Sequence, residues 1–377
     1  MSREQITSAK RIVIKIGSSS LTGKAGSALD AQAVNKLVDV VAACKKRGAE
    51  VVVVSSGAIA AGLAPLGLTT RPKDLATQQA AASVGQGLLV AQYTQSFARH
   101  SITASQVLLT TEDVVRRSHY QNAQRTLYRL LQLGVVPIIN ENDSVGTQEI
   151  RFGDNDHISA LLSHLLKADV LILLTDIDGL YTSDPRTDVS ATLVTDVFEG
   201  DPLMSVDAGS SSSNRGSGGM ASKLSAARIA SWSGVRAVIA QAQIESVLNK
   251  IVAGPIAGTS TIGTTFHGSD RHLSSRQLWV AFASEVRGRV VVDGGAALAL
   301  RGQAVSLLPA GVVGATGEFE VVNTVEVIDP DGGIIARGSS LMSVQQVQIS
   351  AGRRTADLDE HFPQLVIHRD GLVILPS

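Results

Sequence analysis

Short apolar runs alternate with helical stretches along the first 240 residues of the chain. Most of these runs are closed by Gly, Ser, Thr or Asn, which is typical of a buried strand followed by a loop. The predicted strands are residues 11–16, 50–54, 103–109, 135–139, 169–174 and 235–240. The predicted helices, which have apolar positions at helical spacing, are residues 30–47, 74–99, 120–133, 155–167 and 220–233. Strands that alternate with helices predict an open, mainly parallel α/β sheet sandwiched by helices.

The pattern changes near residue 266, where long amphipathic stretches give way to short strands. Residues 267–280 are expected to form a linker, because they begin with a polar run. The strands expected beyond it are 289–292, 304–307, 317–322, 324–328 and 333–336. We therefore predict two domains, residues 1–266 and 281–377, the second a small, mostly β barrel or sandwich.

Composition excludes several classes of protein. Hydrophobic residues make up 44% and charged residues 18% of the chain, as in globular proteins, and the formal net charge is −1. The single cysteine, Cys44, has no partner for a disulfide, and the eight histidines form no ligand pair at helical spacing, so no protein-held metal site is predicted. The apolar run 12–16 is too short for a signal peptide, and no run reaches the roughly 20 apolar residues of a membrane span. A cytoplasmic enzyme or binding protein with no membrane partner is expected.

Carboxylates and amides gather around the end of the strand 135–139. Asn140-Glu-Asn-Asp143 follows that strand, and Gly153-Asp-Asn-Asp156 opens the next helix. In an open α/β sheet, ligands bind at the carboxyl ends of the strands. These residues also suit turns and helix caps, so the cluster alone leaves both interpretations open.

Two further features favour phosphate binding. Residues 216–223 are glycine-rich, open a helix and end in Lys223, so backbone N–H groups and a lysine could face a phosphate. Lys15 interrupts an apolar strand just before Gly17 and three serines. The alternatives are a flexible surface loop for 216–223 and, for Lys15, an edge-strand lysine that discourages aggregation. Residues 17–24 only resemble a P-loop, because the glycine spacing is wrong and Ala25 replaces the Ser or Thr.

Taken together, these segments resemble the amino acid kinase family in order and spacing. The matching motifs are Lys15-Ile-Gly-Ser-Ser, Val54-Ser-Ser-Gly-Ala58, Ile139-Asn-Glu-Asn-Asp143, Gly153-Asp-Asn-Asp156, Leu174-Thr-Asp176, Gly179-Leu-Tyr181 with Asp184-Pro-Arg186, and Gly218-Gly-Met220 with Lys223. The C-terminal part resembles a PUA domain through Val291-Val-Asp293, Gly302, Ser306-Leu-Leu-Pro309, Gly311, Gly317, Phe319 and Ile335-Ala-Arg-Gly338. The resemblance covers nearly the whole chain and implies the amino acid kinase fold followed by a PUA barrel.

The resemblance is closest to the members that phosphorylate the γ-carboxylate of L-glutamate with ATP and Mg²⁺, the first step of L-proline synthesis. It implies catalytic roles for Lys15, Lys223 and Asp156, and glutamate binding by Ser56, Asp143 and Asn155. It implies ATP binding by Lys15, Thr175, Asp176, Ser217, Gly218, Gly219, Met220, Ala221, Ser222 and Lys223. Ser217 and Ala221 depart from the family's common Thr and Ser, which leaves the backbone donors intact.

The same resemblance implies a homodimer or tetramer, inhibition by proline and hand-over of the product to glutamyl phosphate reductase. Rival interpretations are a kinase of aspartate, N-acetylglutamate or a nucleoside monophosphate, a metabolite sensor, and an RNA-binding protein. Residues 281–377 hold seven Arg and no Lys against eleven Asp and Glu, which argues against nucleic acid as a partner.

Overall fold

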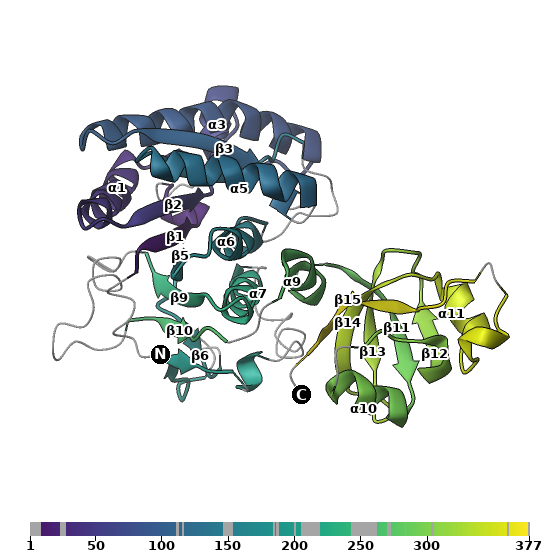
Figure 1. Cartoon of the computed structure of the whole chain (residues 1–377). Helices are drawn as coiled ribbons and strands as arrows, with labels where there is room; N and C mark the ends of the chain where they lie inside the picture. Colours follow the sequence, from purple (N-terminus) through teal and green to yellow (C-terminus); the bar gives the residue numbers. More distant parts are fainter. Residues whose placement is uncertain are drawn as a thin grey trace. The chain divides into compact units, whose positions relative to one another are not determined.

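The structure is a computed structural model in which the chain divides into two compact units, each described here by itself (Figure 1). Unit 1 comprises Met1–Glu199 with Ser212–His272, and unit 2 comprises Gly200–Ser211 with Leu273–Ser377. The residues described are 9–22, 28–110, 113–114, 117–145, 154–183, 185, 188–199, 201–204, 219–242, 262–269, 273–282, 284–302, 305–359 and 362–375.

Unit 1 is built on an eight-stranded sheet with the order β3-β4-β2-β1-β5-β9-β10-β8. The strands are β1 (Arg11–Ile16), β2 (Glu50–Ser55), β3 (Ala104–Leu109), β4 (Val136–Glu141), β5 (Val170–Thr175), β8 (Asp196–Val197), β9 (Arg236–Gln241) and β10 (Thr264–Phe266). The six strands from β3 to β9 in this order pair in parallel, and β10 is antiparallel to β9. The open, mainly parallel sheet predicted from the sequence is confirmed.

The helices of unit 1, apart from a short one at Ala58–Leu63 that was not predicted, lie close to their predicted positions. They are α1 (Ala31–Lys46), α2 (Ala58–Leu63), α3 (Leu75–Ala98), α5 (Arg117–Gln132), α6 (Asp154–Leu165) and α7 (Gly219–Trp232). Asp30 caps α1 by accepting bonds from Gln32 N and Ala33 N, and Asp74 caps α3 through Thr77 N. Both carboxylates satisfy donors that the first helical turn leaves free, which is why the helices begin there.

The two faces of the sheet bury different sets of helices. Alternate β1 side chains, Ile12, Ile14 and Ile16, pack in one core with α1 and α3. Because side chains alternate along a strand, Lys15 points to the opposite face, where α6 packs on β1 and α7 packs on β9. Figure 1 shows α5, α6 and α7 together on that side of the sheet. A lysine on an otherwise apolar strand is thus directed toward α6.

Smaller elements complete unit 1. A small antiparallel pair is formed by β6 (Leu180–Tyr181) and β7 (Leu193–Val194). Single-turn helices of the 3-10 type across both units cover Ser18–Ser20, Ala64–Leu66, Pro202–Met204, Pro309–Gly311 and Thr355–Asp357. None of the helices in the described residues is long and apolar enough to cross a membrane.

Unit 2 contains a five-stranded sheet with the order β12-β11-β13-β14-β15. Its strands are β11 (Val286–Val292), β12 (Val312–Gly317), β13 (Thr324–Ile328), β14 (Ile334–Ser340) and β15 (Ile367–Ile374). Its helices are α9 (Ser275–Phe282), α10 (Gly294–Gly302) and α11 (Val344–Ser350). A mostly β second region is confirmed, whereas the boundaries 1–266, 267–280 and 281–377 stay a prediction; α9 begins inside the expected linker.

Two strands expected in unit 2 are wrong in detail. A strand was predicted at 317–322, but the strand in the structure, β12, covers Val312–Gly317 and so ends at the first residue of the predicted one. Gly317 closes β12 with φ +100°. A Cβ there would lie 2.6 Å from Arg287 O, so only glycine fits. The strand predicted at 304–307 is reduced, within the described residues, to one bridge between Leu307 and Ile367.

Candidate active site

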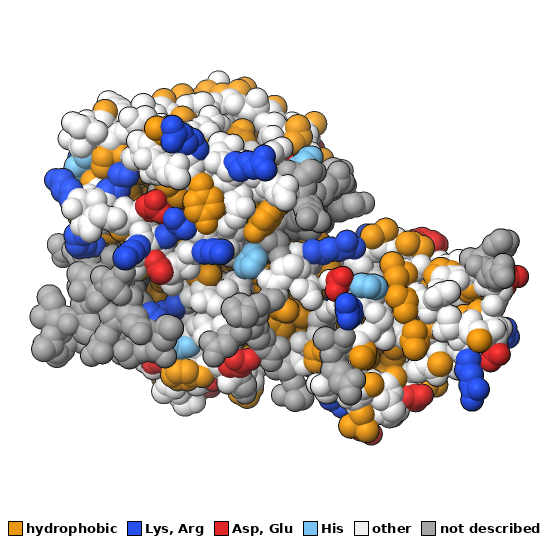
Figure 2. All heavy atoms as spheres, in the orientation of Figure 1, with side chains coloured by type: hydrophobic (Ala, Val, Ile, Leu, Met, Phe, Trp, Pro, Cys, Tyr) orange, Lys and Arg blue, Asp and Glu red, His pale blue; other side chains and the backbone are white. Residues whose placement is uncertain are grey.

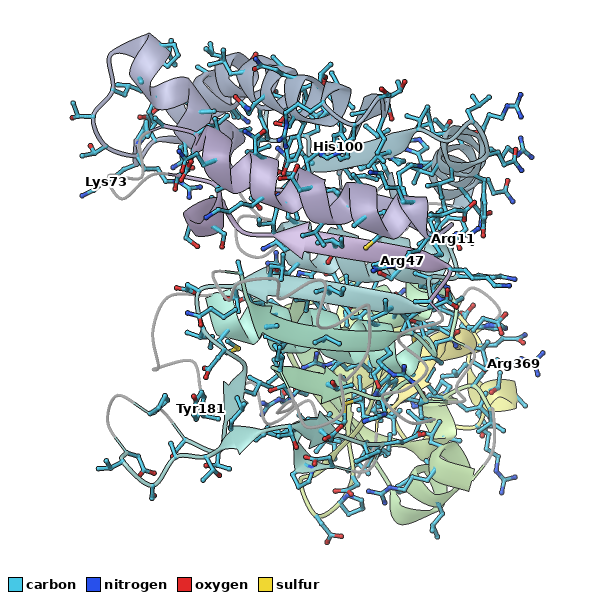
Figure 3. All side chains as sticks on the ribbon, turned by 90° about the vertical axis from the view of Figure 1, so that its left-hand side faces the viewer. Arg11, Arg47, Lys73, His100, Tyr181 and Arg369 are labelled. Carbon is cyan, nitrogen blue, oxygen red and sulfur yellow. The ribbon has the colours of Figure 1, made fainter. Side chains whose placement is uncertain are left out.

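The carboxyl ends of neighbouring parallel strands bring several predicted site residues to one edge of the sheet. The register pairs Lys15 of β1 with Val54 of β2 and with Leu173 of β5. Ser56 therefore follows β2, and Thr175 ends β5, near the level of Lys15. In Figure 3, Arg11 at the start of β1 and Tyr181 beyond β5 mark the two opposite edges. The candidate site lies at the edge where these strands end, as expected for an open α/β sheet.

A buried carboxylate between two lysines forms the centre of this site. Lys15 Nζ lies 2.7 Å from Asp156 Oδ1, and Lys223 Nζ lies 3.6 Å from Asp156 Oδ2. Ser222 Oγ donates a hydrogen bond to the same Oδ2 at 2.7 Å. Asp156 is 2% exposed and Lys15 is 5% exposed. Two positive charges thus converge on one negative charge, which leaves a net positive centre that favours an anionic ligand.

The charges at this centre shift one another's pKa values. Burial alone would raise the pKa of Asp156, but the charges of Lys15 and Lys223 outweigh it, so the pKa is lowered. Burial lowers the pKa of Lys223, and the charge of Lys15 lowers it further, although Asp156 and Asp176 act in the opposite direction. Asp156 is therefore ionised at neutral pH and holds both lysines.

Two helix N-termini supply the side chains of this centre other than Lys15, which comes from β1. Asp156 lies in the first turn of α6, and Ser222 and Lys223 lie at the first turn of α7. The two helices pack against each other, so their first turns meet at the same edge of the sheet. Unpaired N–H groups and the positive end of the helix dipole favour anions at such a place. The geometry suits a ligand that carries several negative charges.

A chain of amide side chains lies beside the charged centre. Asn155 Nδ2 donates to Asn140 Oδ1 at 2.9 Å and to Ser56 Oγ at 3.3 Å. The backbone N–H of Glu141 donates to Asn140 Oδ1 at 2.9 Å and to Asn155 Oδ1 at 3.1 Å. The ends of β2 and β4 and the start of α6 are thereby joined into one polar cluster of Ser56, Asn140, Glu141 N and Asn155, which we call the pocket wall.

The other predicted residues are distributed around these two groups. Thr175 is buried, and its Oγ1 donates to Asp176 Oδ1 at 2.9 Å. Asp143 lies half-buried in the turn after β4. Gly219 begins α7, followed by Met220, which is half-buried, and Ala221, which is exposed. Ser217 and Gly218 lie outside the described residues.

The sequence motifs missed two members of the pocket wall. Asn140 belongs to a motif and also suits a turn, yet it is 1% exposed and bonded on both sides. Gln86 of α3 belongs to none of the sequence motifs, but its Oε1 accepts a hydrogen bond from Asn140 Nδ2 at 2.7 Å. Only a weak sign in the sequence indicates that Gln86 is buried. It falls four residues after Ala82, on the same buried face of a helix rich in small residues.

Comparison with known proteins agrees with this geometry. The Amino acid kinase family profile matches residues 10–241, and the PUA domain profile matches residues 288–362. The glutamate 5-kinase of Thermobifida fusca is 48% identical over 99% of this chain and 95% of its own length. The glutamate 5-kinase of Streptomyces coelicolor is 48% identical over 99% of this chain and 98% of its own length.

Among solved structures, the UMP kinase of Bacillus anthracis is similar, with a TM-score of 0.46 and 15% identity, covering 69% of this chain and 96% of that one. The profiles and the curated relatives span both units of the chain. The chain therefore belongs to the amino acid kinase family, within which it groups with the glutamate 5-kinases, and its C-terminal part is a PUA domain.

Proposed function

We propose that the protein transfers the γ-phosphoryl group of ATP to the γ-carboxylate of L-glutamate, giving L-glutamyl 5-phosphate for L-proline synthesis. The observation that carries the proposal is the buried Lys15–Asp156–Lys223 centre beside a cluster of hydrogen-bonded amide side chains. The names of the relatives, which are close to 48% identical over nearly the whole chain, support it.

The chemistry needs charge screening and positioning rather than a general base. A glutamate carboxylate has an ordinary pKa of about 4.3 and is ionised at neutral pH, so its oxygen can attack phosphorus directly. An anion approaching a polyphosphate is repelled unless positive charge is already in place. Lys15 and Lys223, held by Asp156, supply that charge at the transferred group.

The acceptor is held by the pocket wall in this proposal. Ser56 and Asn155 present polar groups to the substrate, and Asp143 serves as a counter-charge for the α-amino group. Removing Asp143 should then raise the glutamate requirement more than the ATP requirement. The half-buried position of Asp143, just beyond β4, supports this assignment.

ATP occupies the side of the edge formed by β1, β5 and α7. Thr175 and Asp176 lie at the nucleotide, and residues 217–223 surround the phosphates through backbone N–H groups and Lys223. The described residues hold no group of three His, Cys, Asp or Glu side chains fit for a metal ion. Both oxygens of Asp156 are engaged by the lysines and Ser222. Mg²⁺ would be held mainly by ATP itself and would supply positive charge at the transferred group, beside Lys15 and Lys223.

Self-association through α3 is part of the proposal. The outer face of this 24-residue helix has no charged side chain between Leu75 and Ala98, and it exposes Val84 and Leu88. Figure 2 shows white and orange spheres over this helix. A helix face that carries no charge and exposes apolar side chains is often covered by a partner, and a second copy of the chain is the occupant we infer. Inhibition by proline and direct use of the product by glutamyl phosphate reductase complete the proposal.

The test is an acceptor panel. ADP release is measured with ATP and Mg²⁺ and with L-glutamate, L-aspartate, N-acetyl-L-glutamate or UMP, and any acyl phosphate is trapped with hydroxylamine. Trappable product with L-glutamate alone is expected. Activity only with another acceptor would refute the substrate and leave the phosphate site standing.

A further inference from the structure

Gln86 is a buried side chain directly behind the proposed acceptor pocket. It is 8% exposed, and its Oε1 accepts a hydrogen bond from Asn140 Nδ2 at 2.7 Å. Its own Nε2 is buried and has no hydrogen-bond partner among the described residues. Leaving a buried donor without a partner costs about 1–3 kcal/mol. Stability alone therefore does not explain a glutamine at this position.

The backbone of β4 fixes which way each amide in the pocket wall is turned. Glu141 N donates to Asn140 Oδ1 and to Asn155 Oδ1. Because a backbone N–H can only donate, both asparagines must turn their oxygens toward it. Asn140 must then turn its NH₂ group toward Gln86, which meets it with a carbonyl oxygen. Gln86 therefore supplies the acceptor for the Asn140 NH₂ group, which no backbone group pairs with among the described residues.

The direction of the hydrogen bonds also determines the role of the Ser56 hydroxyl. Asn155 Nδ2 donates to Ser56 Oγ at 3.3 Å, so the serine oxygen is an acceptor in that bond. Its single hydroxyl hydrogen is thereby directed to another acceptor. A carboxylate accepts hydrogen bonds and donates none, so it matches this end of the chain.

Helix α3 holds Gln86 in place through direct backbone contact with α2. A Cβ on Gly85 would lie 1.9 Å from Ala58 O, and a Cβ on Gly62 would lie 1.9 Å from Ala81 O. The two helices therefore touch backbone to backbone just before Gln86. Such contact leaves little freedom for the residue that follows.

We propose that Gln86 is a positioning residue for the acceptor. Its carbonyl oxygen holds Asn140, and through Asn140 and Asn155 it holds the Ser56 hydroxyl as a donor to a carboxylate of the substrate. This inference rests on the proposed function for the identity of the acceptor. It assigns Gln86 no contact with ATP or with the reacting atoms.

The test is Gln86→Met, which keeps the length of the side chain and removes the acceptor. Losing one such bond is expected to raise KM for L-glutamate about tenfold, with KM for ATP within about twofold of wild type. Gln92→Met is the matched control on the same helix, because Gln92 Nε2 donates only locally, to Ser96 Oγ at 3.3 Å. This control should keep both KM values.

A double-mutant cycle tests whether Gln86 acts through Asn140. Adding Gln86→Met to Asn140→Ala should not raise KM for glutamate further, because the connecting residue is already gone. Additive effects, or an equal rise in both KM values, would overturn the proposal. If Gln86→Met does not fold, Gln86→Asn, which withdraws the amide by one methylene, replaces it with the same expectation. If the wild type uses another acceptor, the proposed substrate is wrong. The effect of Gln86→Met on KM for that acceptor, compared with its effect on KM for ATP, then tests Gln86 separately.

Discussion

At the scale of single residues, the account depends on one carboxylate that organises two lysines. Asp156 contacts Lys15, Lys223 and Ser222, which come from two other elements of unit 1. Lysine ammonium groups are compact point charges that can follow a moving phosphoryl group, whereas arginine forks are more rigid. The three charges form a preorganised site, because the free energy needed to bring them together is spent when the protein folds and not during the reaction.

Replacing Lys223 should affect turnover far more than substrate binding. Lys223→Ala removes a charge that the proposal places on the transferred group, so kcat should fall on the order of 10²–10³-fold, with little change in KM for glutamate. Lys46→Ala, at the exposed end of α1, is the control and should behave as wild type. A kcat for Lys223→Ala near the wild-type value would contradict the role given to this lysine.

Replacing Asp156 should lower stability in a way that depends on pH. Asp156→Asn leaves two lysines buried without their counter-charge, so the free energy of unfolding should drop by about 3–5 kcal/mol at pH 7. Because the folded-state pKa of Asp156 is lowered, its contribution is complete above the ordinary carboxyl value of 3.8 and is lost as pH falls through the folded value.

The gap in unfolding free energy between wild type and Asp156→Asn, measured by urea denaturation, should stay constant from pH 7 to pH 5. A gap that closes within that range would argue against the charged pair. Glu285→Gln is the control, because its pair with Arg287 is at least about half exposed and should contribute under about 1 kcal/mol.

At the scale of elements, the close packing of α2 on α3 determines where the pocket wall lies. Ser56 precedes α2, Gln86 belongs to α3, and Gly62 and Gly85 bring the helices into contact. Gly57, at φ +107°, turns the chain sharply between β2 and α2. Tyr93 adds a bond of 3.0 Å to Ser55, so α3 supports the end of β2 at a second point.

Two glycines of α3 should respond to alanine in opposite directions. Gly85→Ala would place a methyl group 1.9 Å from Ala58 O and should destabilise unit 1 by about 1–3 kcal/mol. Gly87→Ala meets no atom within 4 Å and should stabilise the helix by about 0.5–1 kcal/mol. Urea unfolding of both variants is the measurement, and destabilisation of equal size in the two would contradict the packing described.

Prediction from sequence succeeded where one face of an element is buried. The six parallel strands and the long helices of unit 1 were placed within a few residues, because apolar periodicity and caps such as Asp30 and Asp74 define them locally. The short elements α2, β8 and β10 were not predicted. β15 was missed because His368-Arg-Asp-Gly371 interrupts its apolar pattern, and α10 was missed because Gly294-Gly295 resembles a turn. Both are stabilised by packing from distant parts of the chain, which a local pattern does not show.

The residues of the candidate site that belong to sequence motifs were predicted, and those outside the motifs were not. Lys15, Asp156 and Lys223 were expected at one site, and the structure brings them together. Gln86 was not expected, and Asn140 was expected only as part of a motif, because their contact depends on how α3 packs against the end of β4. A single glutamine in a helix has no spacing that indicates a partner 54 residues away.

At the scale of the whole molecule, the proposed self-association through α3 gives a test. A carboxylate placed at Leu88 would be buried without a partner in such an interface, so Leu88→Asp should shift the protein toward monomer in size-exclusion chromatography with light scattering. Leu133→Asp, equally apolar and exposed but at the end of α5, should leave the mass unchanged. A wild-type protein that is already monomeric, or identical masses for both variants, would count against this interface.

In the proposed reaction, a carboxylate oxygen of L-glutamate attacks the γ-phosphorus of ATP. The most direct measurement uses L-glutamate labelled with ¹⁸O in its γ-carboxylate, followed by hydroxylamine and ³¹P NMR of the released phosphate. Hydroxylamine attacks the acyl carbon and expels phosphate with the bridging oxygen, so the account predicts one ¹⁸O atom in that phosphate. Unlabelled phosphate, or label only from glutamate marked in its α-carboxylate, would contradict the account.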